Sequence, residues 1–222
     1  MVVPAPAQRR LTPKGQATRE RILAAAAELI TTDGLSALTM VGVRKAASVS
    51  GSQLAHYFSD RQDLIRALIE RQMQTVIDSH RELETFDDFE HWLDSSMRQL
   101  RAVGFSGTPT YHGLAGQLAK SDDAVRGVLA DGYRQWIALL EEAIRRMKQR
   151  GVLIDDADPH QLALVLVGAH QAGGTMAFVY REAWPQADAL RFAVNRLRMY
   201  AVDPAERAPR PPRRPRRQRS AT

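Results

Sequence analysis

The chain has 222 residues, 44% of them hydrophobic, with no cysteine and a formal net charge of +6. This length allows one large or two small domains with a real core, and the absence of cysteine excludes disulfides, thiolate zinc sites and cysteine-based redox sensing. Residues 1–62 contain 8 Lys and Arg against 4 Asp and Glu, and residues 203–222 contain 7 against 2. Residues 63–202 contain 16 against 19, so this middle part is slightly acidic. Only the two ends of the chain therefore have the positive charge that suits nucleic-acid binding.

Residues 1–15 are expected to form a flexible, disordered arm. Their charges are not followed by the apolar run that a secretory signal requires. A first helix is expected from Arg19 to Ile30, where apolar residues recur at helical spacing. Asp33-Gly34 follows this stretch, and glycine is the residue that commonly ends a helix.

The segment from Thr39 to Leu64 has the pattern of two short helices joined by a tight turn, followed by the start of a third helix. Thr39 is a suitable N-cap for the first short helix and Ser50 for the second. In the second helix, Leu54 recurs with Tyr57 and Phe58 at helical spacing, and a separate face remains for Gly51, Ser52, Gln53, Ala55 and His56. Small and hydrogen-bonding residues suit a DNA major groove, so the segment predicts a helix-turn-helix.

Together with its flanks, this segment resembles the N-terminal domain of the TetR/AcrR family of bacterial transcriptional regulators. The likeness is strong over roughly residues 16–69 and elsewhere is limited to helix order and length. The shared features are a long first helix, Gly34-Leu35, Leu38-Thr39, Val49-Ser50, the run His56-Tyr57-Phe58, Arg61 and Asp63-Leu64. The chain departs from the family at Gly51, at Ala55 and at Ala47-Ser48, where the family usually has Ala-Gly, so a left-handed turn is less favourable here.

The resemblance and the side-chain chemistry together predict the DNA contacts. Ser52 and Gln53 are expected to reach base edges, with Gln53 suited to adenine, while Gly51 lets the backbone approach. Ser50, as the cap of the same helix, belongs to this interface. Phosphate contacts are expected from Thr39, Arg44, Lys45, His56, Tyr57 and Arg61. For Tyr57 a place in the core is an equal alternative, and Phe58 is expected in the core.

Every further element is predicted to be a helix. The expected helices span residues 60–80, 87–103, 111–119 and 122–149, then one that begins at Asp158-Pro159 and a last one over 186–200. The predicted fold is therefore all-α. It comprises a helix-turn-helix DNA-binding domain (16–62), a larger helical domain for effector binding and dimerisation (63–202), and a disordered Arg/Pro-rich tail (203–222).

The last two predicted helices are expected to pair with their copies in a homodimer, as the resemblance implies. A run of small residues would let another helix approach closely: Gly168, Ala169, Ala172, Gly173 and Gly174. The final helix would offer Leu190, Ala193, Val194 and Leu197. Burial of these residues within one subunit is the alternative. A two-fold dimer would place two reading helices in major grooves of a palindromic operator in double-stranded DNA.

A small-molecule effector of unknown identity is expected among the body helices. A mostly apolar pocket with a few polar groups would suit a lipophilic or aromatic molecule. Binding could tilt the 60–80 helix and release the DNA. The candidate residues, for each of which core packing is the alternative, are Trp92, Tyr111, His112, Gln117, Tyr133, Trp136, His170, Gln171 and Met176.

No cofactor, metal site or enzyme activity is expected, because Walker A, GxGxxG, GxSxG and HExxH motifs are all lacking. Asp155-Asp156-Ala157-Asp158 lacks the pattern of a calcium loop and is interpreted as a loop with a helix cap. His91 and Asp94 form only a weak metal hypothesis. No apolar run is long enough to predict a membrane span. A cytoplasmic location is expected, because the absence of cysteine fits a reducing compartment.

The sequence therefore predicts a TetR-like regulator, with repression implied by the resemblance. Two alternatives remain. One is a helix-turn-helix dimer controlled by a partner protein or by no ligand, and the other is an all-helical enzyme. The tail, with seven arginines among prolines, either attracts DNA non-specifically or has no role.

Overall fold

The computed structural model describes residues 11–80, 83–105, 118 and 123–207, and this part of the chain confirms the all-α prediction. Besides helices it contains one isolated antiparallel bridge between Leu153 and Ala201. The chain divides into two compact units, residues 1–68 and 69–222. The division lies inside α4 (Arg61–His80), between residues 68 and 69. The sequence predicted a domain boundary between residues 62 and 63, near the start of the same helix.

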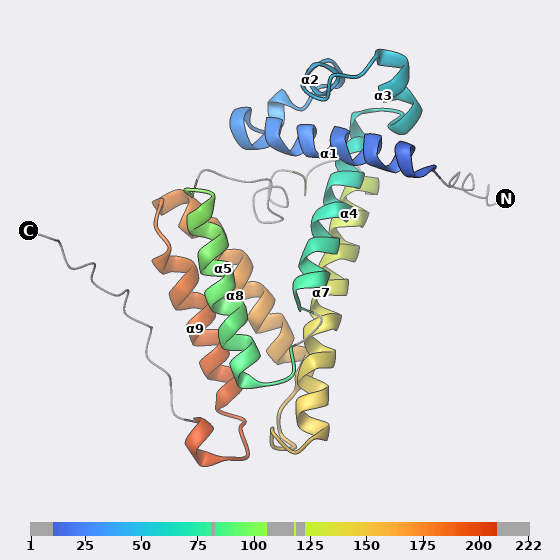
Figure 1. Ribbon diagram of the computed structural model, residues 1–222. Coiled ribbons are helices and arrows are strands. Elements are labelled where there is room, and N and C mark those ends of the chain that lie inside the picture. The colour runs from blue at the N-terminus through green and yellow to red at the C-terminus, as the bar shows by residue number, and fades with distance from the viewer. Residues whose placement is uncertain (1–10, 81–82, 106–117, 119–122, 208–222) are drawn as a thin grey trace, which may run out of the picture. The chain divides into compact units, whose positions relative to one another are not determined.

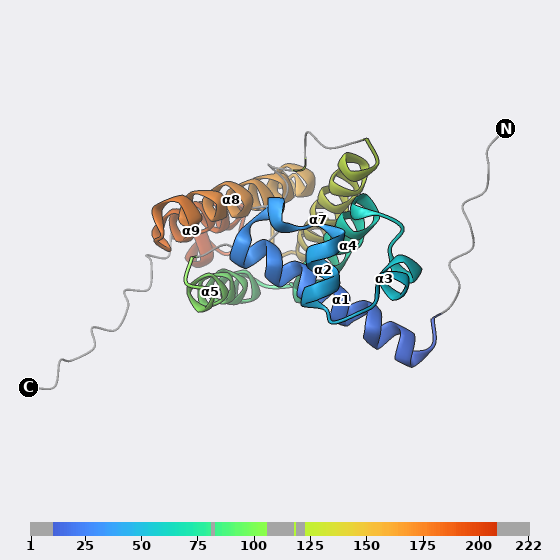
Figure 2. The same ribbon diagram turned by 90° about the horizontal axis from the view of Figure 1, so that it is seen from above.

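The first unit contains α1 (Pro13–Asp33), the short 3-10 helix η1 (Leu35–Ala37), α2 (Met40–Ala46), α3 (Gly51–Tyr57) and the start of α4. Helix α1 packs against η1 and α2, and α2 packs against α3, as Figure 2 shows. Apolar residues at helical spacing on each element meet in one small core. Its buried members are Ile22, Leu23, Ala26, Leu38, Val43, Leu54, Phe58, Leu64 and Ile65.

Helix α1 begins earlier than the sequence indicated. Thr12 is its N-cap, with Oγ1 accepting a hydrogen bond of 3.2 Å from the backbone N–H of Gly15, and Pro13 occupies the first turn. A capping threonine followed by proline favours helix initiation, so residues 13–15 are helical and do not belong to a disordered arm. Residues 1–10 lie outside the described part of the chain.

The turn between α2 and α3 contains a residue in the left-handed conformation. This residue is Ser48, at the position where the family usually has glycine. Ser48 has a φ of 52°, a value that side chains other than glycine adopt only at a cost. The turn is held by a hydrogen bond of 3.2 Å from the backbone N–H of Ser48 to the carbonyl of Lys45. The strain is therefore located at the residue that joins the two helices.

The second unit is a helical bundle that contains the remainder of α4, α5 (Phe86–Ala102), α7 (Asp123–Gln149), α8 (Pro159–Tyr180) and α9 (Trp184–Arg198). Helix α8 packs against α7 on one side and α9 on another, and α9 also packs against α5 (Figure 1). Asp158 caps α8 by accepting hydrogen bonds from the backbone N–H groups of His160 and Gln161, which confirms its interpretation as a helix cap.

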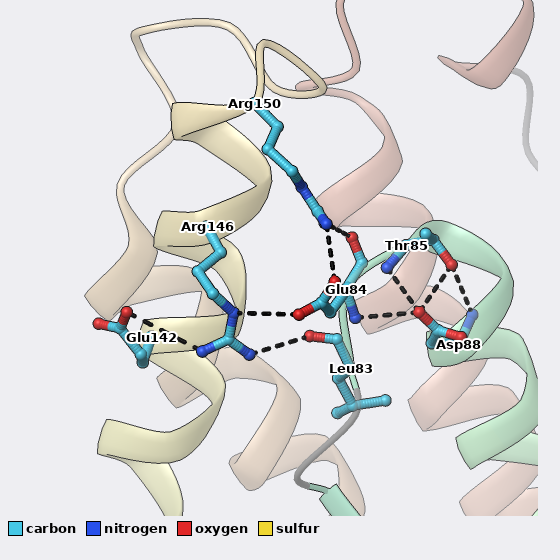
Figure 3. Close-up of polar contacts among 7 residues, drawn as sticks. All are labelled: Leu83, Glu84, Thr85, Asp88, Glu142, Arg146 and Arg150. Carbon is cyan, nitrogen blue, oxygen red and sulfur yellow. Dashed lines mark hydrogen bonds and ion pairs between the residues drawn. The ribbon is translucent and has the colours of Figure 1, made fainter.

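Arg146 of α7 and Arg150, the residue directly after α7, contact the segment that leads into α5, as Figure 3 shows. Arg150 pairs with the Glu84 carboxylate at 2.8 Å and also donates to the Glu84 carbonyl. Arg146 lies 3.6 Å from the same carboxylate and donates to the Leu83 carbonyl at 3.4 Å. Immediately afterwards, Thr85 and Asp88 form a reciprocal capping box that starts α5. Leu83 and Glu84, just before α5, are thus tied to the C-terminal end of α7 and to Arg150 by side-chain contacts.

Helices α8 and α9 approach closely within the same chain at Gly173. A Cβ added there would lie 2.8 Å from the Cα of Gln186, so only glycine fits. The prediction that four residues of the final helix form a dimer interface is wrong, because their side chains are buried inside this unit and cannot contact another copy. These residues are Leu190, Ala193, Val194 and Leu197. The alternative, burial within one subunit, is correct for these four.

The part expected as a tail begins with ordered structure. Residues 204–207 form a 3-10 helix, η2, and the side chain of Arg207 donates to the Ala201 carbonyl at 2.7 Å. Residues 208–222, like most of the expected 111–119 helix, lie outside the described residues.

Among the described helices, α8 alone is long and apolar enough to cross a membrane, by length and composition only. Core helices of bundles share this composition, and α8 packs between α7 and α9. The hydropathy of α8 is therefore only weak evidence for a membrane span.

Candidate functional site

Helix α3 is a short, well-capped helix with one buried side and one open side. The Oγ of Ser50 accepts a hydrogen bond of 3.1 Å from the backbone N–H of Gln53 and lies 3.1 Å from the Oγ of Ser52. Leu54 and Phe58 anchor the opposite side in the core. The residues predicted to approach DNA through this helix are all exposed: Ser50, Gly51, Ser52, Gln53 and His56.

Helix α2 presents further predicted contacts beside α3. Thr39 is exposed and caps α2, with Oγ1 accepting from the backbone N–H of Gly42 at 3.0 Å. Arg44 and Lys45 are exposed in its last turn. A Cβ added to Gly51 would lie 4.0 Å from the Cδ of Arg44, so this arginine extends along the start of α3. The two helix ends therefore place cationic and hydrogen-bonding groups together.

Arg61 has a structural role that the sequence did not indicate. Its Nε donates to the carbonyl of Leu38 at 2.6 Å, and its Nη2 donates to the carbonyl of Leu35 at 3.2 Å. The guanidinium thereby satisfies backbone acceptors at η1 and before α2. This leaves it fewer donors for the expected phosphate contact.

Tyr57 has features of both expected roles, a contact with phosphate and a place in the core. The side chain is half-buried, and its ring meets the ring of His56 edge-on at 5.0 Å between centroids. A Cβ added to Gly15 would lie 3.6 Å from the Tyr57 hydroxyl, so this hydroxyl reaches the first turn of α1. Phe58, in contrast, is buried as expected.

In the second unit, three of the residues predicted for an effector come together in an aromatic cluster, defined here as His80, Trp92, Trp136 and His170. His80, Trp92 and Trp136 are buried, and His170 is half-buried. The Trp92 and His170 rings are stacked within 10° of parallel, with centroids 5.5 Å apart. Trp136 meets His170 edge-on at 5.1 Å. The cluster joins the end of α4 to α5, α7 and α8.

His80 and Ser96 belong to this site but were missed from the sequence. His80 Nδ1 donates to the Val76 carbonyl at 2.5 Å, and its ring lies 5.0 Å from that of Trp92. Burial lowers the pKa of His80 to about 4, so the ring is neutral at physiological pH. Ser96 Oγ lies 3.4 Å from His170 Nε2. Both occupy apolar positions of their helix registers, which is the signal that could have identified them.

The other predicted effector residues are more dispersed. Tyr133 lies one turn before Trp136 on α7, and burial raises its pKa to about 12. Gln171 is half-buried, whereas Met176 is 43% exposed and points away from the core. Tyr111, His112 and Gln117 lie outside the described residues.

A surface hollow elsewhere in this unit contains none of the predicted effector residues. It is lined by Thr85, Phe86, Asp87, Gly151, Val152, Ala201, Val202, Asp203 and Glu206. No group of three or more His, Cys, Asp or Glu in the described residues is arranged to hold a metal ion. His91 instead places Nδ1 2.8 Å from the Asp87 carbonyl.

A stripe of large apolar side chains is exposed along α8 and α9. Phe192 is 74% exposed and Val179 77% exposed, although both lie on helices whose other sides are buried. We call this stripe the open face; it consists of Leu164, Val165, Met176, Val179, Tyr180, Trp184 and Phe192. Gly168 and Ala172 are exposed between its members. Exposed apolar residues that gather on one side of a protein mark interaction surfaces.

Comparison with protein families gives two matches that cover both units. Residues 22–68 match the model for bacterial regulatory proteins of the tetR family. Residues 89–193 match a tetracyclin repressor-like C-terminal domain. A comparison with curated proteins gives no significant match.

Solved structures show the same fold. Regulatory protein TetR from Rhodobacter sphaeroides is 20% identical, with 80% of this chain and 97% of that one covered and a TM-score of 0.70. Reduced NemR from E. coli is 23% identical over 81% of this chain and 97% of its own, with a TM-score of 0.69. A TetR-family regulator from Cytophaga hutchinsonii is 15% identical, with 88% of this chain and 100% of that one covered and a TM-score of 0.72.

Proposed function

The chain belongs to the TetR family of bacterial regulatory proteins and is a DNA-binding transcription regulator, not an enzyme; from this premise we propose that it acts as a homodimeric repressor in the cytoplasm. The dimer binds a palindromic operator through α3 and leaves it when a lipophilic or aromatic effector binds. The observation that carries the proposal is that Ser52 and Gln53 are exposed on a helix whose other side is fixed in a core.

The open face supports the dimer. Leaving several large apolar side chains in water is unfavourable, and burial returns roughly 25 cal/mol for each Å² of apolar surface. Gly168 and Ala172 would allow the helices of a second copy to approach closely. Two copies related by a two-fold axis would place their α3 helices in major grooves separated by one or more helical turns of about 34 Å.

The aromatic cluster supports control by a small molecule. It lies at the end of α4, the helix that continues from the DNA-binding unit into the body. An effector that binds the DNA-released conformation more tightly shifts the population toward that conformation. Movement of His80 relative to Trp92 and Trp136 is the change by which binding at the cluster would reach α4.

One observation favours a second candidate, a dimer without a ligand. The rings of the aromatic cluster contact one another directly, with Trp136 and His170 centroids 5.1 Å apart. A core already filled by its own side chains suits a regulator controlled by a partner protein or by its concentration alone. Thermal unfolding in the presence of a broad set of aromatic compounds separates the two candidates, since only the ligand-responsive protein is stabilised.

Selection of bound sequences from a random DNA pool tests the DNA-binding proposal. We expect enrichment of a palindrome, because a two-fold dimer presents the same α3 residues to both half-sites. Enrichment of a single unrepeated element, or of no element at all in low salt, would reject the operator proposed here. Sedimentation of the complex gives the number of chains for each DNA.

A further inference from the structure

The indole N–H of Trp136 is a buried donor without a hydrogen bond. The side chain is 1% exposed, and Nε1 has no hydrogen-bond partner among the residues that the structure describes. Buried tryptophan N–H groups ordinarily find a partner, because an unmet buried donor costs about 1–3 kcal/mol. Such a donor beside a candidate effector site is an unused recognition element.

The described groups that contact one another around this donor are aromatic or polar, and none of them is a carboxylate, ammonium or guanidinium group. Trp92 and His170 form a stack, Trp136 meets its edge, and Ser96 adds a hydroxyl beside His170 Nε2. The fully buried arginine of this unit, Arg198, is instead paired with Glu90 and Glu206.

These properties restrict the ligand chemistry. A planar ring is favoured, because it can extend or replace a member of the Trp92–His170 stack. A carboxylate is disfavoured, because burial of an anion without a cation costs far more than the ring contacts return. A plain hydrocarbon would leave the Trp136 N–H unmet. Gln171 is not included, because adjacent residues on a helix point in different directions.

We propose that the aromatic cluster binds an uncharged planar aromatic effector whose carbonyl, or an equivalent acceptor, receives a hydrogen bond from Trp136 Nε1. This assignment rests on the proposed function, since it concerns the chemical class of the effector. It identifies Trp136 as the specificity-determining residue and Trp92 and His170 as the aromatic platform.

Three naphthalenes of similar shape test the assignment by calorimetric titration of the full chain. They are 2-acetonaphthone, which has a neutral acceptor, 2-ethylnaphthalene, which has none, and 2-naphthoate, which is charged. We expect 2-acetonaphthone to bind about tenfold more tightly than either of the others, the ratio that corresponds to one restored hydrogen bond. Tighter binding of 2-naphthoate, or equal binding of the two neutral compounds, would overturn the assignment.

Trp136→Phe removes the N–H and keeps an aromatic ring. We expect the preference for 2-acetonaphthone over 2-ethylnaphthalene to fall to about one, with 2-ethylnaphthalene affinity little changed. Trp184→Phe is the matched control, because Trp184 lies on the open face and should leave the preference intact. A preference that persists in Trp136→Phe contradicts the role of the N–H. The wild-type comparison of the three compounds holds even where the variant folds poorly.

The same titrations separate this inference from the proposed function. A chain that binds a palindrome but none of the three naphthalenes refutes the effector class and leaves operator binding in place. A chain that selects 2-acetonaphthone but retards no DNA refutes the proposed function while the chemistry of the cluster stands.

Discussion

At the scale of single residues, Gln53 is the exposed side chain on α3 best suited to reading a base. Its amide can both donate to and accept from adenine in the major groove. Gln53→Ala should therefore lose about 1–3 kcal/mol of binding free energy on the selected operator and little on random DNA. Fluorescence anisotropy with both DNAs at several salt concentrations measures the two losses.

Lys45→Ala is the comparison for this measurement. Lys45 is exposed at the end of α2, and loss of a phosphate contact should weaken binding to both DNAs alike. Arg61→Ala, which the sequence alone would select, also removes hydrogen bonds to Leu35 and Leu38 and so affects folding. Equal losses on operator and random DNA for Gln53→Ala would remove it from base reading.

Ser48 carries backbone strain that glycine would relieve. Because its φ is 52°, Ser48→Gly should raise the free energy of unfolding by about 1 kcal/mol, as measured by urea denaturation. Gly34→Ala is the opposite case, since Gly34 has a φ of 80° with no atom near the position of a Cβ. That substitution should destabilise the protein through the backbone alone. A loss of stability in Ser48→Gly would show that the serine side chain outweighs the strain.

His80 should make stability depend on pH. Burial lowers its pKa from 6.5 to about 4, so protons bind the unfolded chain more readily than the folded one. The contribution of neutral His80 is intact above pH 6.5 and declines toward pH 4, with a loss of about 2 kcal/mol by pH 5. His80→Gln should be less sensitive over this interval in urea unfolding at pH 7, 6 and 5. The same decline in both proteins would assign it to other groups.

At the scale of helices, Gly173 determines how closely α8 and α9 pack. Gly173→Ala places a methyl group 2.8 Å from the Gln186 backbone, so the helices must separate, at a cost of about 1–3 kcal/mol. Gly127→Ala is the matched control on α7, where a Cβ meets nothing within 4 Å and helix propensity should increase stability by about 0.5–1 kcal/mol. Thermal unfolding of both variants checks the sign of each effect, and stabilisation by Gly173→Ala would show that the gap adapts.

Periodicity and end signals in the sequence were sufficient to predict the α-helices of the described residues, because each has an amphipathic stripe or clear end signals. Asp158-Pro159 started α8 and Gly151 followed α7 as expected. The early start of α1 followed from Thr12-Pro13, a local signal that the apolar pattern alone did not contain. End signals thus decide helix limits where the hydrophobic period does not.

The side on which each apolar residue of α8 and α9 lies could not be predicted in the same way. Helix α8 is apolar nearly all round, so its sequence does not distinguish the side facing α7 and α9 from the side facing outward. Only packing shows that Leu166 is buried and Leu164 exposed. The same limit applies to His80, whose role depends on Trp92 and Trp136, residues distant in sequence.

At the scale of the whole molecule, the open face should decide whether two chains act together. Phe192→Asp places a charge at its most exposed ring and should convert the dimer to a monomer in sedimentation velocity experiments. Affinity for the palindrome should then fall at least about tenfold, because each chain binds one half-site. Val41→Asp is the control, since Val41 is 59% exposed in the other unit and should leave the dimer intact. A dimeric Phe192→Asp protein would place the interface elsewhere.

The fastening of the α4–α5 connection has a consequence for experiments at varied ionic strength. Arg146, Arg150 and Glu84 are each between one third and one half exposed, so dissolved ions reach and weaken their attraction. Added salt therefore weakens the attachment of the segment before α5 at the same time as it displaces the chain from phosphates. The salt dependence of DNA affinity will therefore contain both effects. Glu84→Gln removes the ion pairs and leaves the phosphate contacts, so the difference in slope between the two proteins gives the contribution of the ion pairs.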